Sequence, residues 1–429
     1  MVPHLRTALK GALSDLELKM MDATPMIERW FRMEWQEHTP PFYSSVDVRN
    51  SGIKFAPIDT NLFPGSFNHL AEELYPLAIQ AAMAAVEKYC PDAKNLLLIP
   101  EDSRQNQRYL QNVDHLAKIL RLTGLNVRLG STSPEITEPT AVDVGNGQSL
   151  IFEPLHFNGR RLTLDNGQFD PCTILLNDDL SNGVPEILRG IHEQILLPPL
   201  HAGWTTRRKS THFSIYDAVV KRFAKFLDID PWLINALHAK VSDVDFSNPD
   251  FVNGLAQTAE AMLKKIAKKY KEYGISDKPF LMLKPDAGTK GIGVTTIYSA
   301  DDIRELSNKD CGASCLLKNG LAAADILLQE GVPTIETVRS SSAEPVVYMI
   351  DRYVVGGFYR SNEQRGLDEN LNSTGMQFTP MPFVKQSERS LSDLNTAHNR
   401  FYSYGVIGRL AMLAASLELE QTDPNPDFL

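Results

Sequence analysis

The chain has 429 residues, which is enough for two or three packed domains with a sizeable core. Hydrophobic residues make up 43% and charged residues 22%, an ordinary balance for a soluble globular protein. The formal charge is −10, and lysine and arginine are scattered apart from a short run at Lys264, Lys265, Lys268 and Lys269, so nucleic acid is not expected as a partner. No apolar stretch reaches about 18 residues, so no membrane span is expected.

The N-terminus and the cysteines favour a cytoplasmic protein. The first 20 residues carry apolar side chains at helical spacing with charges on the opposite face, which predicts a helix and not a signal peptide. Four cysteines in a chain of this length are too few for a disulfide scaffold. Cys311 and Cys315 have no second cysteine pair or histidine nearby, so no zinc site is expected. We therefore expect reduced cysteines, and a homo-oligomer stays possible.

The first 200 residues alternate between strand patterns and helix patterns. Short apolar runs predict strands at 95–100, within 149–157 and at 172–178. Apolar faces at helical spacing predict helices over 71–89 and 104–122. Such alternation is typical of a mostly parallel sheet covered by helices.

The second half begins with helices and continues with strands, an α+β pattern. Residues 211–274 are predicted to be largely helical, with Gly274 as a C-cap, and a final helix is predicted over 402–419. The strands expected between them are 280–284, 295–299, 324–332 and the two arms of a hairpin over 344–360 that turns at Asp351–Arg352.

The strand at 280–284 delivers Lys284 to a loop that contains three glycines. Glycines lack a Cβ, so the backbone N–H groups of such a loop can approach phosphates, and the lysine can neutralise their charge. The loop is neither a Walker A loop nor GxGxxG, and a strand follows it instead of a helix. A plain hairpin with a surface lysine is the alternative interpretation.

A second strand ends in Gln329 and Glu330 before a break at Gly331. The exposed backbone of such a strand end can pair with an adenine ring. The alternative is a strand that simply ends in polar residues.

Asp59 and Asn61 are two positions apart on a predicted strand, so their side chains leave the same face. One carboxylate and one amide oxygen suit Mg²⁺, which takes oxygen donors and few protein ligands. The alternative is an Asp/Asn turn before Pro64.

These elements together resemble the ATP-grasp superfamily, in which a lysine strand, a Gly-rich loop and a later hinge strand enclose ATP. The early Asp-x-Asn motif resembles eukaryotic-type glutathione synthetase, whose ATP-grasp domain is circularly permuted. Longer strings resemble the proteobacterial GshA-type glutamate–cysteine ligase family. They include FAPIDTNLFPGSFNHL (55–70), KPDAGTKGIGV (284–294) and AEPVVYMIDRYVVGGFYR (343–360).

The resemblance implies an α/β fold that is ATP-grasp-like and glutathione-synthetase-like. Residues 1–200 would form an α/β domain with a parallel sheet that contributes substrate and metal contacts, and residues 201–429 the nucleotide-binding domain. The implied reaction makes γ-glutamylcysteine from glutamate and cysteine through a γ-glutamyl phosphate, with ATP and Mg²⁺. Glutathione synthetase or another ATP-grasp amino-acid ligase is one alternative, and a non-catalytic nucleotide-binding regulator is another.

The resemblance also implies roles for particular residues. Lys284, Arg49 and Arg360 are expected to be catalytic. The expected metal ligands are Asp59, Asn61 and Asp286, and the expected nucleotide contacts are Lys284, Asp286, Gly288, Thr289, Lys290, Gly291, Gly293, Gln329, Glu330, Val332, Asp351 and Asn372.

A second lysine that contacts ATP is left open between Lys240, Lys269 and Lys318. The basic residues at 207–209, within the stretch GWTTRRKSTHF (203–213), are predicted to form a solvated turn.

Overall fold

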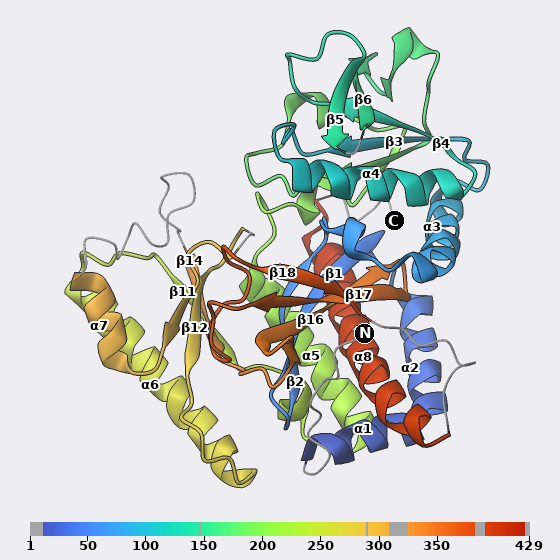
Figure 1. Cartoon of the computed structure of the whole chain (residues 1–429). Helices are drawn as coiled ribbons and strands as arrows, with labels where there is room; N and C mark the ends of the chain where they lie inside the picture. The colour runs from blue at the N-terminus through green and yellow to red at the C-terminus, as the bar shows by residue number, and fades with distance from the viewer. Residues whose placement is uncertain (1–11, 146, 289–290, 309–324, 382–390, 425–429) are drawn as a thin grey trace.

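The computed structural model describes residues 12–145, 147–288, 291–308, 325–381 and 391–424 (Figure 1). Three larger sheets and their helices make up a mixed α/β fold, which confirms the predicted class. The sheets differ in character, because one is mostly parallel and the other two are antiparallel.

The first sheet, at the top of Figure 1, has the strand order β10-β9-β3-β4-β6-β5 and is parallel except for the pair β5–β6. Its central strand β3 is buried on both faces: Leu96 and Leu98 pack with α3 and α4, and Leu97 and Ile99 pack in a second cluster on the opposite face. The predicted parallel sheet is therefore confirmed. Its elements are α3 (Tyr75–Tyr89), β3 (Asn95–Pro100), α4 (Gln107–Leu122), β4 (Asn126–Ser131), β5 (Thr140–Gly145), β6 (Gln148–Pro154), β9 (Thr173–Asn177) and β10 (Ile195–Leu197).

The central sheet joins the two ends of the chain. Its order is β18-β17-β16-β1-β2, all antiparallel, with β15 beside β16. The predicted division at residue 200 stays a prediction, although this sheet takes strands from both sides of it. The strands are β1 (Tyr43–Asn50), β2 (Phe55–Asn61), β15 (Thr337–Val338), β16 (Ser341–Ile350), β17 (Tyr353–Asn362) and β18 (Gln377–Pro380).

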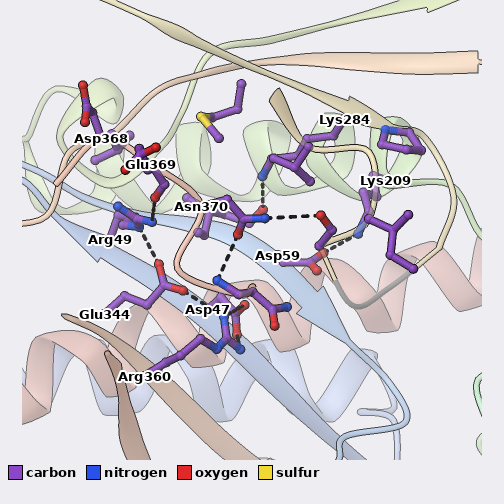
Figure 2. A pocket seen from close by; sticks show the side chains of 18 of the residues that line it. Asp47, Arg49, Asp59, Lys209, Lys284, Glu344, Arg360, Asp368, Glu369 and Asn370 are labelled. Carbon is purple, nitrogen blue, oxygen red and sulfur yellow. Dashed lines mark hydrogen bonds and ion pairs between the residues drawn. The ribbon is translucent and has the colours of Figure 1, made fainter. Parts of the chain in front are cut away.

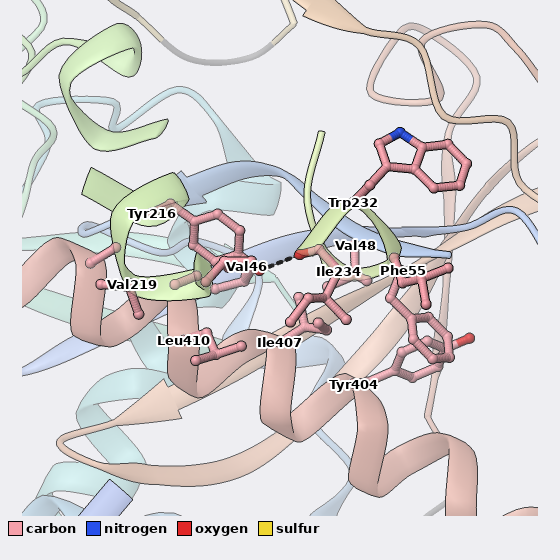
Figure 3. Close-up of a cluster of buried hydrophobic side chains, with 14 of the residues drawn as sticks. Val46, Val48, Phe55, Tyr216, Val219, Trp232, Ile234, Tyr404, Ile407 and Leu410 are labelled. Atoms are coloured by element: carbon pink, nitrogen blue, oxygen red, sulfur yellow. Dashed lines mark hydrogen bonds between the residues drawn. The ribbon is translucent and has the colours of Figure 1, made fainter. Parts of the chain in front are cut away.

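Helix α8 (Leu391–Thr422) packs against this central sheet, and α5 (Lys209–Leu227) packs against α8. Figure 3 shows Ile407 and Leu410 of α8 against Val46 and Val48 of β1, with Tyr216 of α5 beside them; all five are buried. Helix α8 therefore packs the C-terminal end of the chain against β1, the first strand in the sequence.

The third sheet has the order β11-β14-β12-β13 and carries the lysine strand. Its alternation is clear in β12: Leu281 and Leu283 face the core that includes α6, and Lys284 leaves the other face. The strand β11 was not predicted, because it lies inside a stretch whose flanks are helical. The elements are β11 (His238–Ser242), α6 (Pro249–Glu272), β12 (Leu281–Pro285), β13 (Thr295–Ile297), α7 (Ala300–Asn308) and β14 (Asp325–Glu330).

Of the two helices at the N-terminal end, one was predicted. The helix α1 (Ala12–Asp22) lies within the predicted N-terminal helix, and residues 1–11 lie outside the described residues. The helix α2 (Thr24–Glu37) was not predicted, although it buries Ile27 and Phe31 four positions apart.

The cysteine expectation is wrong for one pair. Cys90, at the end of α3, and Cys172, before β9, form a disulfide. Cys311 and Cys315 lie outside the described residues. In the described part of the chain, no helix is long and apolar enough to span a membrane; the cytoplasmic location stays a prediction.

We predict that Gly357→Ala in β17 lowers the melting temperature. A Cβ at this position would lie 2.3 Å from the carbonyl oxygen of Val346 on the paired strand, so the backbone must shift. Overpacking of this kind costs about 1–3 kcal/mol. Gly254→Ala is the control, because a Cβ there meets nothing within 4 Å and α6 gains helix propensity. Equal melting temperatures for the two variants would contradict the packing argument.

Candidate functional site

A cavity lies between the lysine strand β12 and the central sheet. Its lining comes from β1, β2, β12, β16, β17, the glycine loop after β12, and residues 368–372. The empty space is about 850 Å³, including the part that opens to solvent.

One end of the cavity is apolar. Phe280, Met282 and Val332 line it, together with Ile292 and Val294 of the glycine loop. Val332 follows the strand end that was predicted to bind adenine. A flat, uncharged base suits such a lining, and the structure brings the predicted hinge strand and the predicted loop to the same end.

Lys284 lies in the middle of the cavity and is buried. Its ammonium group donates to the side-chain oxygen of Gln329 at 2.7 Å and to the carbonyl oxygen of Ile58 at 2.9 Å. Burial lowers the pKa of Lys284 to about 8, and the negative charge of Asp59 opposes only part of that shift. Gln329 therefore supports the lysine and does not itself line the cavity.

Asp59 faces Lys284 from β2 and forms an ion pair with a second lysine. Its carboxylate accepts a hydrogen bond from Lys209 at 2.6 Å. Burial alone would raise the pKa of Asp59, but the charges of Lys209 and Lys284 outweigh burial and hold the pKa below its ordinary value. Lys209 lines the cavity, so the predicted solvated turn is wrong at this residue.

Of the three candidates for the second lysine, Lys240 and Lys269 do not line the cavity. Lys240 pairs with Asp325 at 2.8 Å, and Lys269 pairs with Asp230 at 2.7 Å. Lys318 lies outside the described residues.

Asn61 supports a cation site beside Asp59. Its side-chain oxygen is buried and accepts no hydrogen bond within the described part of the chain. A buried acceptor without a donor is costly, and a cation would satisfy it. No group of three or more His, Cys, Asp or Glu that could hold a metal occurs among the described residues. Asp59 lines the cavity, and Asn61 does not, but its unsatisfied oxygen leaves the same face of β2. These two oxygen donors fit Mg²⁺, which needs few protein oxygens when phosphate and water complete its shell.

Four buried charges of alternating sign form the other end of the cavity (Figure 2). Arg49 donates to Glu344 at 2.5 Å, and Arg360 donates to Glu344 at 2.8 Å and to Asp47 at 2.7 Å. Burial would lower the pKa of Arg360, but Asp47 and Glu344 outweigh it and raise that pKa. The pKa of Asp47 is raised, chiefly by burial and despite Arg360. We call these four residues the charged array.

Strand geometry explains the charged array. Asp47 and Arg49 lie two positions apart on β1, so both face the cavity, and Glu344 and Arg360 are direct partners across β16 and β17. Asp47 and Glu344 were not predicted. The signal that could have found Asp47 is its two-residue spacing from Arg49.

Residues 367–372 lie across the mouth of the cavity. Arg49 donates to the carbonyl oxygens of Leu367 at 3.0 Å and Glu369 at 2.7 Å. Gly291 of the glycine loop has φ 65°, and a Cβ there would lie 2.4 Å from the carbonyl oxygen of Asn372. The two segments therefore meet over the site, and only glycine permits this contact.

Several predicted nucleotide contacts are placed differently. Gly288, Gly291, Glu330, Val332 and Asn372 line the cavity, whereas Gly293 and Gln329 do not. Thr289 and Lys290 lie outside the described residues.

The contacts of the Glu330 side chain do not favour a nucleotide contact. Its carboxylate accepts from Lys54 at 2.9 Å, from the indole of Trp232 at 3.0 Å and from the backbone of Leu237 at 2.9 Å. It therefore stabilises the hinge strand from behind.

Asp286 is not brought into the cavity lining. Its carboxylate accepts from the backbone N–H and from the hydroxyl of Ser210, both at 2.7 Å. Ser210 lies in the first turn of α5, where N–H groups lack helix partners, so Asp286 caps that helix. The structure therefore does not place Asp286 with Asp59 and Asn61.

Asp351 lies at the opposite end of the hairpin from the site. It occupies the turn between β16 and β17 with φ 50°, and it pairs with Lys88 at 3.6 Å. Asp351 lies seven positions after Glu344, which corresponds to a distance of about 23 Å at ~3.3 Å per residue of strand. The structure places it away from the cavity.

An apolar end, two lysines beside the carboxylate of Asp59, and a charged array in one cavity define a nucleotide-dependent enzyme that acts on a charged substrate. The model of the family "Glutamate-cysteine ligase" (GshA) matches residues 17–419. The chain belongs to this family of ATP-dependent ligases.

One solved structure agrees with this assignment. A crystal structure described as a gamma-glutamylcysteine synthetase, from Methylobacillus flagellatus KT, is 51% identical, with a TM-score of 0.88, over 99% of this chain and 100% of that chain. D-alanyl-alanine synthetase A from Vibrio cholerae O1 biovar eltor is 11% identical over 74% of this chain and 81% of that chain, with a TM-score of 0.34. A search of curated proteins finds no match.

We predict that affinity for a non-hydrolysable ATP analogue falls as the pH rises through about 8, because Lys284 then loses its charge. Calorimetric titration between pH 7 and 9.5 measures this. Lys284→Arg keeps the charge over that range and should give a flatter profile.

The titration of Lys284 does not destabilise the fold over this pH range, so it cannot lower the affinity by unfolding the protein. The ordinary lysine pKa of 10.5 applies to the unfolded chain, so between pH 8 and 10.5 the unfolded state binds more protons. The contribution of Lys284 to the free energy of unfolding therefore rises with pH in this window. Identical profiles for the wild type and Lys284→Arg would contradict the role of Lys284.

Proposed function

We propose that this cavity joins glutamate to cysteine with ATP, the first step of glutathione biosynthesis, and that Lys284, Lys209 and Asp59 meet where the phosphates react. The observation that carries the proposal is their convergence between an apolar end and a charged array, in a chain of the glutamate–cysteine ligase family. The three residues come from β12, α5 and β2, so only the folded chain creates this arrangement.

ATP enters with its base at the apolar end, against Phe280, Met282 and Val332. Its phosphates then reach Lys284 and Lys209, whose ammonium groups neutralise charge as the γ-phosphoryl group moves. The carboxylate of Asp59 keeps Lys209 oriented toward the cavity.

Asp59 and Asn61 would hold Mg²⁺. When bound, the ion supplies charge neutralisation to the phosphate oxygens. The sequence expectation of Asp286 as a further ligand is not part of this proposal, because its carboxylate caps α5.

Glutamate is placed by the charged array, whose arginines suit carboxylates. An oxygen of its γ-carboxylate attacks the γ-phosphorus of ATP, and ADP leaves with the electrons of the broken P–O bond. The cysteine amine then attacks the acyl carbon, the amide C–N bond forms, and phosphate leaves as the nitrogen loses its proton. Arg49 and Arg360 hold substrate in this scheme, while the protein forms no covalent bond with it.

Water must be excluded because it would hydrolyse the γ-glutamyl phosphate. The glycine loop and residues 367–372 already meet through Gly291 and Asn372 over the cavity. Their contact gives the site a cover built from two segments about 80 residues apart.

The test is ADP release from purified protein with Mg-ATP and glutamate, with and without cysteine, followed by mass spectrometry of the product. Cysteine-dependent release with γ-glutamylcysteine as product is expected. Turnover only with γ-glutamylcysteine plus glycine would overturn the substrate assignment and keep an ATP-dependent ligase. Nucleotide binding without any turnover would indicate a regulator instead.

We predict that Asp59→Asn lowers kcat by at least about 100-fold, the scale of losing one strong electrostatic contact near a reacting group. The variant should stay folded, because the amide can still accept from Lys209, but its melting temperature should fall, since the buried ammonium groups of Lys209 and Lys284 lose their negative partner. Asp351→Asn is the matched control and should keep wild-type activity, since Asp351 lies in the distant hairpin turn. Equal activity in the two variants would contradict the role of Asp59.

A further inference from the structure

A buried network of charges lies directly behind the strand that carries Asp59 and Asn61. Glu418, in the last turns of α8, has a side chain only 2% exposed and accepts from Arg207 at 3.0 and 3.1 Å. It also pairs with the ring nitrogen Nδ1 of His212 at 2.9 Å. Burial would raise the pKa of Glu418, but Arg207 and His212 outweigh it and keep that pKa below its ordinary value.

Both partners of Glu418 also contact the same residue of β2. Arg207 donates to the carbonyl oxygen of Thr60 at 2.6 Å, and the Nε2 of His212 lies 2.9 Å from the hydroxyl of Thr60. We call Glu418, Arg207, His212 and Thr60 the β2 clamp. None of these four residues lines the cavity.

Thr60 stands between the two proposed metal ligands. Because strand side chains alternate, Asp59 and Asn61 leave one face of β2 and Thr60 leaves the other. The β2 clamp therefore holds the strand from behind without competing for the cation.

β2 needs such a hold because it is the last strand of the central sheet, where β1 is its only partner among the described strands. The carbonyl oxygen of Thr60 accepts from Arg207 at this edge. The N–H of Thr60 donates to the carboxylate of Asp59 at 3.2 Å. Rotation of the strand end would therefore break the contact with Arg207 and turn Asp59 away from Lys209.

We propose that Glu418, Arg207 and His212 are positioning residues for the cation site of Asp59 and Asn61, acting through Thr60. This inference rests on the proposed function. It assigns a positioning role to the end of α8, none of whose described residues lines the cavity. Groups that orient metal ligands typically contribute about 10–100-fold to metal affinity.

The experiment measures Mn²⁺ binding by electron paramagnetic resonance in the presence of a non-hydrolysable ATP analogue, and the Mg²⁺ dependence of turnover. Glu418→Gln removes the charge that orients Arg207 and His212. Thr60→Val removes the hydroxyl and keeps the branched shape, so it decides the matter if Glu418→Gln does not fold. Thr60→Ser restores the hydroxyl.

Glu28→Gln is the control, because Glu28 pairs with Arg409 of the same helix α8 at 2.8 Å. Arg409 lies nine residues before Glu418, about 13 Å along the helix. A general loosening of α8 should affect this variant as well, whereas loss of positioning should not.

We expect Glu418→Gln and Thr60→Val to bind Mn²⁺ about tenfold or more weakly and to need correspondingly more Mg²⁺, with kcat at saturating Mg²⁺ less affected. Thr60→Ser and Glu28→Gln should bind like the wild type. Folded variants with wild-type Mn²⁺ affinity would overturn the β2 clamp and leave the proposed function intact. A wild type that binds no Mn²⁺ with the analogue would overturn both.

Discussion

The pairing of buried charges between strands from opposite ends of the chain is the interaction on which the site depends. An ion moved from water into a protein interior costs several kcal/mol unless a partner and hydrogen bonds compensate it. Arg360 of β17 meets this requirement through Asp47 of β1 and Glu344 of β16, and Arg49 completes the array. Loss of one member would leave a buried charge unpaired, at a cost of about 3–5 kcal/mol.

The same requirement shapes the rest of the cavity. Lys284 is buried beside Gln329 and Asp59, and Lys209 is balanced by Asp59. In the proposed mechanism, the phosphates and carboxylates of the substrates replace or extend these contacts and meet donors that are already oriented. Because such preorganised groups act by positioning and charge neutralisation, the proposed mechanism needs no nucleophilic side chain.

Local patterns predicted much of the frame. The lysine strand, the glycine loop, the parallel sheet and the hairpin at 344–360 all depend on short-range periodicity and turn residues, which a single sequence displays. The structure also brings Arg49, Asp59, Lys284 and Arg360 into one cavity, as the resemblance implied.

The misplaced residues depend on contacts between distant segments. Asp286 meets Ser210 across 76 positions and caps α5, which no local pattern reveals. Lys209 looked like part of a solvated turn, because its partner Asp59 is 150 positions away. Asp351 was expected to contact the nucleotide because the surrounding sequence resembles the family. The length of strand β16 places it far from the cavity. Sequence reasoning therefore found the elements better than it found their tertiary partners.

The central claim is that the cation and the phosphates meet between β2 and β12. A crystal structure with Mn²⁺ and a non-hydrolysable ATP analogue, with the anomalous signal of the metal, tests it most directly. The account predicts Mn²⁺ about 2.1 Å from oxygens of Asp59 and Asn61, with the γ-phosphate analogue beside Lys284 and Lys209. Mn²⁺ bound at Asp286, or phosphates bound away from Lys284, would contradict it.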